Sequence, residues 1–68
     1  MATEFESTMA HIVASIRSAG YDPYSQLYGY LTEGDETYIT RTGGARDMVK
    51  ALNKNDLRLY IEALRDMK

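Results

Sequence analysis

The sequence predicts an all-α fold, a small bundle of four short helices with an irregular connector at 35–44. Two observations predict it. Apolar residues recur at spacings of three and four in four separate stretches, and capping residues and glycines mark where these stretches begin and end. We expect helices at about 4–19, 23–33, 45–52 and 54–67, all within a single domain that spans residues 1–68.

The first helix is indicated by an apolar stripe and by signals at both ends. The apolar residues that share one side of its helical wheel are Phe5, Met9, Ile12, Val13 and Ile16. Thr3 and Glu6 have the spacing of a capping box, and Gly20 stands where a helix commonly ends. His11, the single histidine, falls on the polar side, where we expect it to be solvated.

The second helix has the same kinds of signal at its two ends. Asp22 is an N-cap residue followed by Pro23 at the first helical position, and Gly34 marks the end. The residues expected on its inner stripe are Tyr24, Leu27, Tyr28 and Leu31. Tyr30 projects to one side of that stripe, so a single chain gives it no obvious place in a core.

The connector at 35–44 differs from the helices on either side. Tyr38, Ile39 and Thr40 have the composition of a strand, whereas the pair Gly43-Gly44 breaks regular structure. We expect an ordered connector with one extended stretch. A lone strand has no pairing partner within the chain, unless a second copy of the chain supplies it.

Helical spacing then resumes for the rest of the chain. The apolar positions of the third helix are Ala45, Met48, Val49 and Leu52. Asn53, with Asp56 three residues later, marks the start of the fourth helix. Its inner stripe comprises Leu57, Tyr60, Ile61, Leu64 and Met67. Leu59 lies well off this stripe and is expected at the surface.

Composition excludes several classes of function. The chain has 68 residues, no cysteine and one histidine, which removes disulfides, thiolate metal sites and most histidine-based metal sites or catalytic triads. No nucleophile can be paired with a base, so we expect no catalytic residues, no metal and no cofactor. Glu4 and Glu6 stand where a signal peptide would carry basic residues, and no apolar run is long enough to cross a membrane. The expected location is the cytoplasm.

A chain of this size is marginally stable alone. Apolar burial for its mass contributes on the order of 100 kcal/mol, and ordering 68 residues costs about the same. A packed or intertwined homodimer would supply the missing stabilisation. Aromatic and aliphatic side chains surrounded by polar residues are typical of interfaces, and the residues expected at the dimer or partner interface are Tyr30, Tyr38 and Leu59.

Basic residues gather after the connector. Arg41, Arg46 and Lys50 flank or follow Gly43-Gly44, which favours a contact with an anion or an acidic partner. With Lys54 they suggest an alternative function, nucleic-acid binding through the basic face at 41–54. The sequence pI of about 5.2 argues against that alternative.

Several short motifs keep a fixed order and spacing over about residues 12–64: Gly20-Tyr21-Asp22-Pro23, Gln26-Leu27, Gly29-Tyr30-Leu31, Gly34-Asp35, Tyr38-Ile39, Arg41 and Ala45-Arg46. Together they resemble the IreB family of small regulatory proteins from low-GC Gram-positive bacteria. Two prolines common in that family are replaced here by Glu36 and Thr40.

The resemblance implies a non-enzymatic, all-helical homodimer that is a substrate of a membrane Ser/Thr kinase. It also implies a role as a negative regulator of cephalosporin resistance. The phosphorylated residues of the family are threonines on an N-terminal tail ahead of the first helix. The threonines in the N-terminal part of this chain, Thr3 and Thr8, do not match the motif of that tail and are the candidate positions here. A phosphate at either position would lie near the start of the first helix, where negative charge is favourable.

Overall fold

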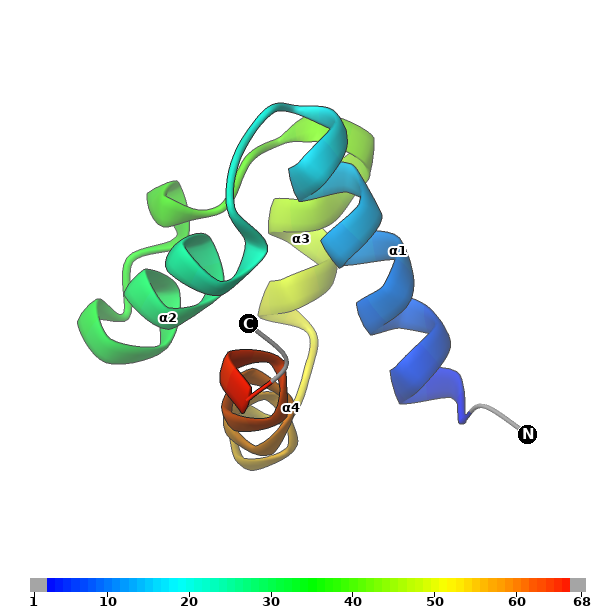
Figure 1. Cartoon of the computed structure of the whole chain (residues 1–68), viewed down its shortest axis with the longest axis vertical. Helices are drawn as coiled ribbons and strands as arrows, with labels where there is room; N and C mark the ends of the chain where they lie inside the picture. Colours follow the sequence, from blue (N-terminus) through cyan, green and yellow to red (C-terminus); the bar gives the residue numbers. More distant parts are fainter. Residues whose placement is uncertain (1–2, 67–68) are drawn as a thin grey trace.

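The computed structural model describes residues 3–66, and its architecture confirms the all-α prediction (Figure 1). Within these residues there are four α-helices and no strand. The α-helices are α1 (Glu4–Ser18), α2 (Pro23–Glu33), α3 (Ala45–Lys50) and α4 (Lys54–Asp66). Two 3-10 turns, η1 (Glu36–Tyr38) and η2 (Thr42–Gly44), occupy the connector. Met67, expected on the inner stripe of the last helix, lies outside the described residues.

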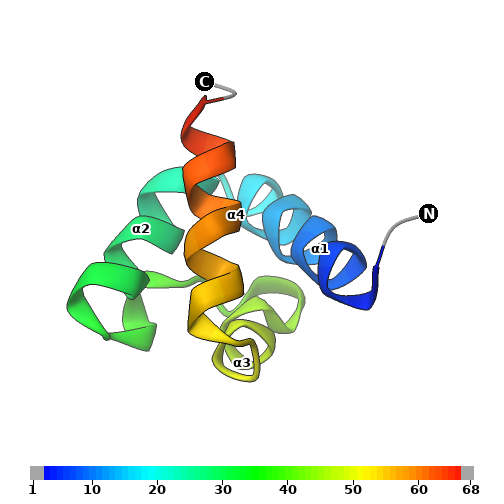
Figure 2. The same cartoon turned by 90° about the horizontal axis from the view of Figure 1, so that it is seen from below.

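The helices pack as two neighbouring groups. One group is α1 with α3 and η2, and the other is α2 with α4 and η1. Contacts between α1 and α2 and between α3 and η1 join them. In Figure 2, α4 runs between α2 on one side and α1 on the other. The backbones of α1 and α4 do not pack closely along their described lengths, and side chains of both helices line a hollow between them.

Helix ends follow the capping signals in the sequence. The Oγ1 of Thr3 accepts a hydrogen bond from the Glu6 amide at 3.1 Å, and the Glu6 carboxylate accepts from the Thr3 amide, which completes the capping box. The Ser25 amide donates to Asp22 Oδ2 at 2.9 Å at the start of α2. Each pair satisfies amide groups that a first helical turn leaves without partners.

The core lies where the four helices converge. Its fully buried large side chains are Met9, Ile12, Ile16, Leu27, Ile39, Val49 and Leu57. Ile39 is the anchor of the connector: it has extended backbone geometry, as expected for this stretch, and its side chain is completely buried. The Gln26 Oε1 accepts a hydrogen bond from the amide of the next residue, Thr40, at 3.0 Å and ties the connector to α2.

The prediction that Tyr30 lies outside the single-chain core is wrong. Its side chain is only 7% exposed and belongs to the core cluster. Pro23, Leu27 and Tyr30 are spaced i, i+4 and i+7, so they form a second stripe, and this is the one that α2 buries. Tyr28, expected on the inner stripe, is instead 49% exposed.

A candidate regulatory interface

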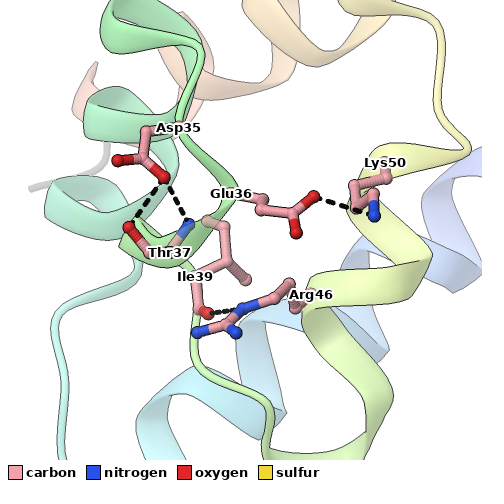
Figure 3. Close-up of polar contacts among 6 residues, drawn as sticks. All are labelled: Asp35, Glu36, Thr37, Ile39, Arg46 and Lys50. Carbon is pink, nitrogen blue, oxygen red and sulfur yellow. Dashed lines mark hydrogen bonds and ion pairs between the residues drawn. The ribbon is translucent and has the colours of Figure 1, made fainter.

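One ion pair and one hydrogen bond join the connector to α3 (Figure 3). The Arg46 Nε donates to the carbonyl oxygen of Ile39 at 2.9 Å. The Lys50 ammonium pairs with Glu36 Oε2 at 2.8 Å, with both side chains nearly half exposed. The buried Ile39 side chain and these two contacts hold the connector at three points, so this surface is an ordered one.

Two groups of this network have shifted pKa values. The pKa of Asp35 is lowered, first because Thr37 Oγ1 donates to its carboxylate at 2.7 Å, then because the Thr37 amide donates at 2.9 Å, with a smaller attraction from Arg46. The pKa of Lys50 is raised because Glu36 accepts a hydrogen bond from its ammonium and attracts its charge. Both shifts favour the charged form of the group.

These shifts predict a pH dependence at the two extremes only. The stabilisation from Asp35 is present above about pH 3.9, the pKa of an unfolded aspartate, and is lost as the pH falls through the lowered pKa. The stabilisation from Lys50 is present below about pH 10.4 and is lost as the pH rises through the raised pKa.

Thermal unfolding at a series of pH values tests both assignments. The melting temperatures of wild type and Asp35→Asn should converge in acid, and those of wild type and Lys50→Met should converge in alkali. Differences that stay constant with pH would contradict this assignment.

The basic residues predicted to contact an anion or a partner are only partly brought together. Arg41 and Arg46 line one hollow of about 340 Å³ with Glu36, Gly44 and Asp47. Two carboxylates thus accompany the two guanidinium groups. Lys50 is paired with Glu36, and Lys54 lies 6.0 Å above the Tyr30 ring. The structure therefore shows a mixed-charge surface rather than the uninterrupted basic stripe that a nucleic-acid backbone favours.

The residues predicted at a dimer interface lie at different places. The Tyr38 ring packs against Gly29 of α2, so closely that a Cβ at Gly29 would overlap it, yet the side chain is 45% exposed. Leu59 is 60% exposed and lies on the side of α4 that faces the start of α1. With Tyr30 in the core, the three predicted residues do not form one patch.

Leu59 belongs to an apolar groove that the sequence did not reveal. This α1–α4 groove has a volume of about 680 Å³ and is lined by Thr3, Phe5, Glu6, Asp56, Leu59, Tyr60 and Ala63. The rings of Phe5 and Tyr60 meet edge to face across it, with centroids 6.2 Å apart. Phe5 also lines an adjacent hollow of about 480 Å³ together with Met48 and Leu52. The two hollows share Phe5, and most of the other side chains that line them are apolar.

The two candidate threonines differ in accessibility. Thr3 precedes α1, is exposed, and has an extended backbone. Its hydroxyl takes part in the capping box, accepting from the Glu6 amide and donating to the Glu6 carboxylate at 3.2 Å. Thr8 lies within α1, is half-buried, and lines the hollow beside Phe5.

His11 has a structural contact that the polar face did not indicate. The side chain is exposed, as expected, but its Nε2 lies 2.9 Å from the carbonyl oxygen of Gly43 in η2. Among residues 3–66 no three His, Cys, Asp or Glu side chains are grouped closely enough to hold a metal ion. Through its contact with the Gly43 carbonyl, the His11 imidazole connects α1 to the connector.

Comparisons with known proteins place the chain in a family. No helix in the described part of the chain is both long and apolar enough to cross a membrane. No solved structure matches the chain. The model of one family, described as the IreB regulatory phosphoproteins, matches residues 1–65 of the 68-residue sequence. The match covers every helix described above except the last residue of α4, and the chain therefore belongs to the IreB family of regulatory phosphoproteins.

Proposed function

We propose that this protein is a non-catalytic regulatory module of the bacterial cytoplasm, that it works as a homodimer, and that a Ser/Thr kinase phosphorylates it. The family match over residues 1–65 carries the proposal. The family resemblance favours a role as a negative regulator of cephalosporin resistance that acts downstream of the kinase. The contacts of His11 support a role without catalysis, because its Nε2 is directed to a backbone carbonyl rather than to a nucleophile.

Thr3 is the phosphate acceptor that best fits the geometry. Kinases act on accessible hydroxyls in extended segments, and Thr3 is exposed and extended whereas Thr8 is half-buried within a helix. A phosphate on Thr3 would sit at the N-terminus of α1, where the helix dipole favours negative charge. It would also stand beside Glu4 and Glu6. The carboxylates of Glu4 and Glu6 would repel the phosphate. Phosphorylation would therefore loosen the capping box and change the rim of the α1–α4 groove.

Incubation with a cognate kinase and ATP should therefore label Thr3 in preference to Thr8, as read by mass spectrometry of the intact protein and its peptides. Thr3→Ala should abolish the main phosphorylated species, and Thr8→Ala should leave it. Thr3→Ser is the matched control because serine preserves both the N-cap and a phosphate acceptor. Labelling that survives Thr3→Ala unchanged would contradict this site.

The α1–α4 groove is the surface that we assign to dimerisation. Its lining is mainly apolar, and Leu59 is 60% exposed beside Phe5 and Tyr60. A two-fold dimer brings the same patch of each copy together, so each copy would cover the other's groove. Burying one leucine contributes about 1.5–3 kcal/mol, and symmetry doubles this contribution.

Leu59→Glu should raise the dimer dissociation constant at least about a hundredfold, as measured by sedimentation equilibrium. The substitution is at an exposed position and should by itself change the stability of the protomer by no more than about 0.5 kcal/mol. Any fall in the melting temperature should therefore follow from the lost dimer and depend on protein concentration.

Asn55→Glu is the matched control. It adds the same charge to an exposed position of α4 outside the groove and should leave the dimer intact. A wild-type chain that stays fully folded as a monomer at micromolar concentration would overturn the homodimer. A Leu59→Glu variant that dimerises as well as wild type would move the interface away from this groove.

A further inference from the structure

A second groove lies on the other side of α4, against α2. This α2–α4 groove has a volume of about 240 Å³. The residues that line it are Tyr24, Tyr28, Leu31, Thr32, Arg58, Ile61, Glu62 and Arg65. Leu31 and Ile61 give it an apolar floor, with Leu31 half-buried and Ile61 buried. Its lining residues do not overlap with those of the α1–α4 groove.

Two tyrosines form one wall of this groove. The rings of Tyr24 and Tyr28 stack with centroids 5.5 Å apart and planes 22° apart. Tyr28 is 49% exposed although it belongs to a helix packed on α4. Exposed tyrosine above an apolar floor is typical of protein-binding surfaces, because the ring offers a large contact area with little loss of conformational entropy.

The opposite wall carries an ordered series of charges. Arg58, Glu62 and Arg65 all line the groove from α4, and at 100° per residue they fall on one face of the helix. The two arginines are seven residues apart, which corresponds to about 10.5 Å along the helix axis. Within residues 3–66, Arg58 has no ion pair, and Arg65 approaches only its exposed neighbour Asp66, at 3.8 Å. Such an exposed pair holds the guanidinium weakly.

We propose that the α2–α4 groove binds an amphipathic, mainly acidic helix of a partner protein. The series positive, negative, positive on α4 is matched by a helix with Glu at positions i and i+7 and Lys at i+4, because that helix has the same 10.5 Å repeat. A leucine at i+3 of the partner enters the hollow over Leu31 and Ile61. The proposal goes beyond the proposed function, since it needs neither a dimer nor a phosphate.

Other occupants fit these features less well. The hollow is smaller than the roughly 300–1,000 Å³ of typical small-molecule sites, so it suits one inserted side chain rather than a whole ligand. A nucleic-acid strand has phosphates of one sign throughout, and Glu62 between the arginines would repel it. The tyrosine rings also stack on each other rather than standing apart to receive a base.

Two designed helical peptides test the proposal against the intact chain. The first carries Glu, Leu, Lys and Glu at i, i+3, i+4 and i+7, and the second exchanges every Glu for Lys and the Lys for Glu. A tryptophan at the end of each peptide reports binding by fluorescence anisotropy, because the chain itself contains none. We expect the first peptide to bind at least about tenfold more tightly than the second, a difference of about 1.4 kcal/mol.

Variants of α4 then connect this preference to the groove. Arg58→Glu with Arg65→Glu should weaken the first peptide at least about tenfold, and adding Glu62→Lys should make the protein prefer the second peptide. Arg58→Gln with Arg65→Gln, which adds no negative charge, should also weaken the first peptide. Arg17→Glu, at an exposed site of α1, is the matched control and should leave the affinity unchanged.

Four results would overturn the proposal. They are no binding of either peptide at millimolar concentration to folded wild type, equal binding of both, and affinities insensitive to both arginine variants. The fourth is an oligothymidylate that binds more tightly than either peptide and loses affinity on Arg58→Glu with Arg65→Glu, which would assign the groove to single-stranded nucleic acid. Sedimentation equilibrium of the same variants separates this test from the dimer: failure of the peptides leaves the Leu59→Glu result unaffected.

Discussion

Replacing Tyr30 with alanine is expected to lower the free energy of unfolding by about 3–5 kcal/mol, the range for removing a buried aromatic side chain. Tyr30 is 7% exposed and packs in the core on the same stripe of α2 as Leu27. A chain of this size has a total stability of only a few kcal/mol, so much of the variant should be unfolded at room temperature. Chemical denaturation followed by circular dichroism measures the loss.

Tyr30→Phe keeps the ring and is the matched control, with an expected loss of no more than about 1 kcal/mol. Tyr30→Leu gives a measurable intermediate if the alanine variant does not fold. Sedimentation equilibrium on the folded variants separates the core from an interface. A Tyr30→Leu protein that keeps its stability but dissociates would return Tyr30 to the dimer interface and contradict its burial within the chain.

Tyr30 also shows where the sequence pattern reaches its limit. Helix α2 carries apolar or aromatic residues around much of its circumference, so the stripe through Tyr24 and Leu31 and the stripe through Pro23 and Tyr30 are both possible. Periodicity alone does not choose between them. The choice comes from the tertiary packing of α2 on α4 and η1, which buries Tyr30 and leaves Tyr28 exposed.

The helices themselves were accessible from the sequence because their signals are local. The Thr3 capping box, the Asp22 cap and the left-handed Gly34 all form within one turn of the residues that encode them. The connector contacts are of another kind. Arg46 donates to the carbonyl of Ile39, seven residues away, and His11 contacts the carbonyl of Gly43, thirty-two residues away. No residue type indicates which backbone carbonyl a side chain reaches, so these contacts required the three-dimensional structure.

The same distinction applies to the candidate interface. Leu59 could be predicted at the surface, because it falls off the stripe of α4. Its groove could not, because the groove depends on how α1 and α4 are placed in space, with the Phe5 ring of one helix against the Tyr60 ring of the other. The charges of the α2–α4 groove follow one helix face and are visible in the sequence, but their role depends on the tyrosines that α2 places opposite them. The sequence therefore indicates which residues are exposed or charged, and the tertiary packing determines which residues lie beside them.

The Gly43-Gly44 pair gives the second large effect, because the two glycines share a backbone conformation and differ in their surroundings. Gly43 has φ 63° and Gly44 has φ 76°, both in the left-handed region that other residues avoid. A Cβ at Gly44 would meet nothing within 4 Å, whereas a Cβ at Gly43 would overlap the hydroxyl of the buried Ser15.

Gly44→Ala should therefore cost only the backbone strain, about 1–2 kcal/mol. Gly43→Ala should cost that strain plus about 1–3 kcal/mol for the overlap with Ser15, and should weaken the contact between His11 and the Gly43 carbonyl. Ser15→Ala combined with Gly43→Ala removes the clashing oxygen and should recover part of the second cost. Denaturation of wild type and of these three variants measures the two costs and the recovery. Equal losses in the free energy of unfolding for Gly43→Ala and Gly44→Ala would contradict this prediction. They would show that Ser15 of α1 moves aside at little cost, so that the close approach of η2 to α1 does not hold the connector in place.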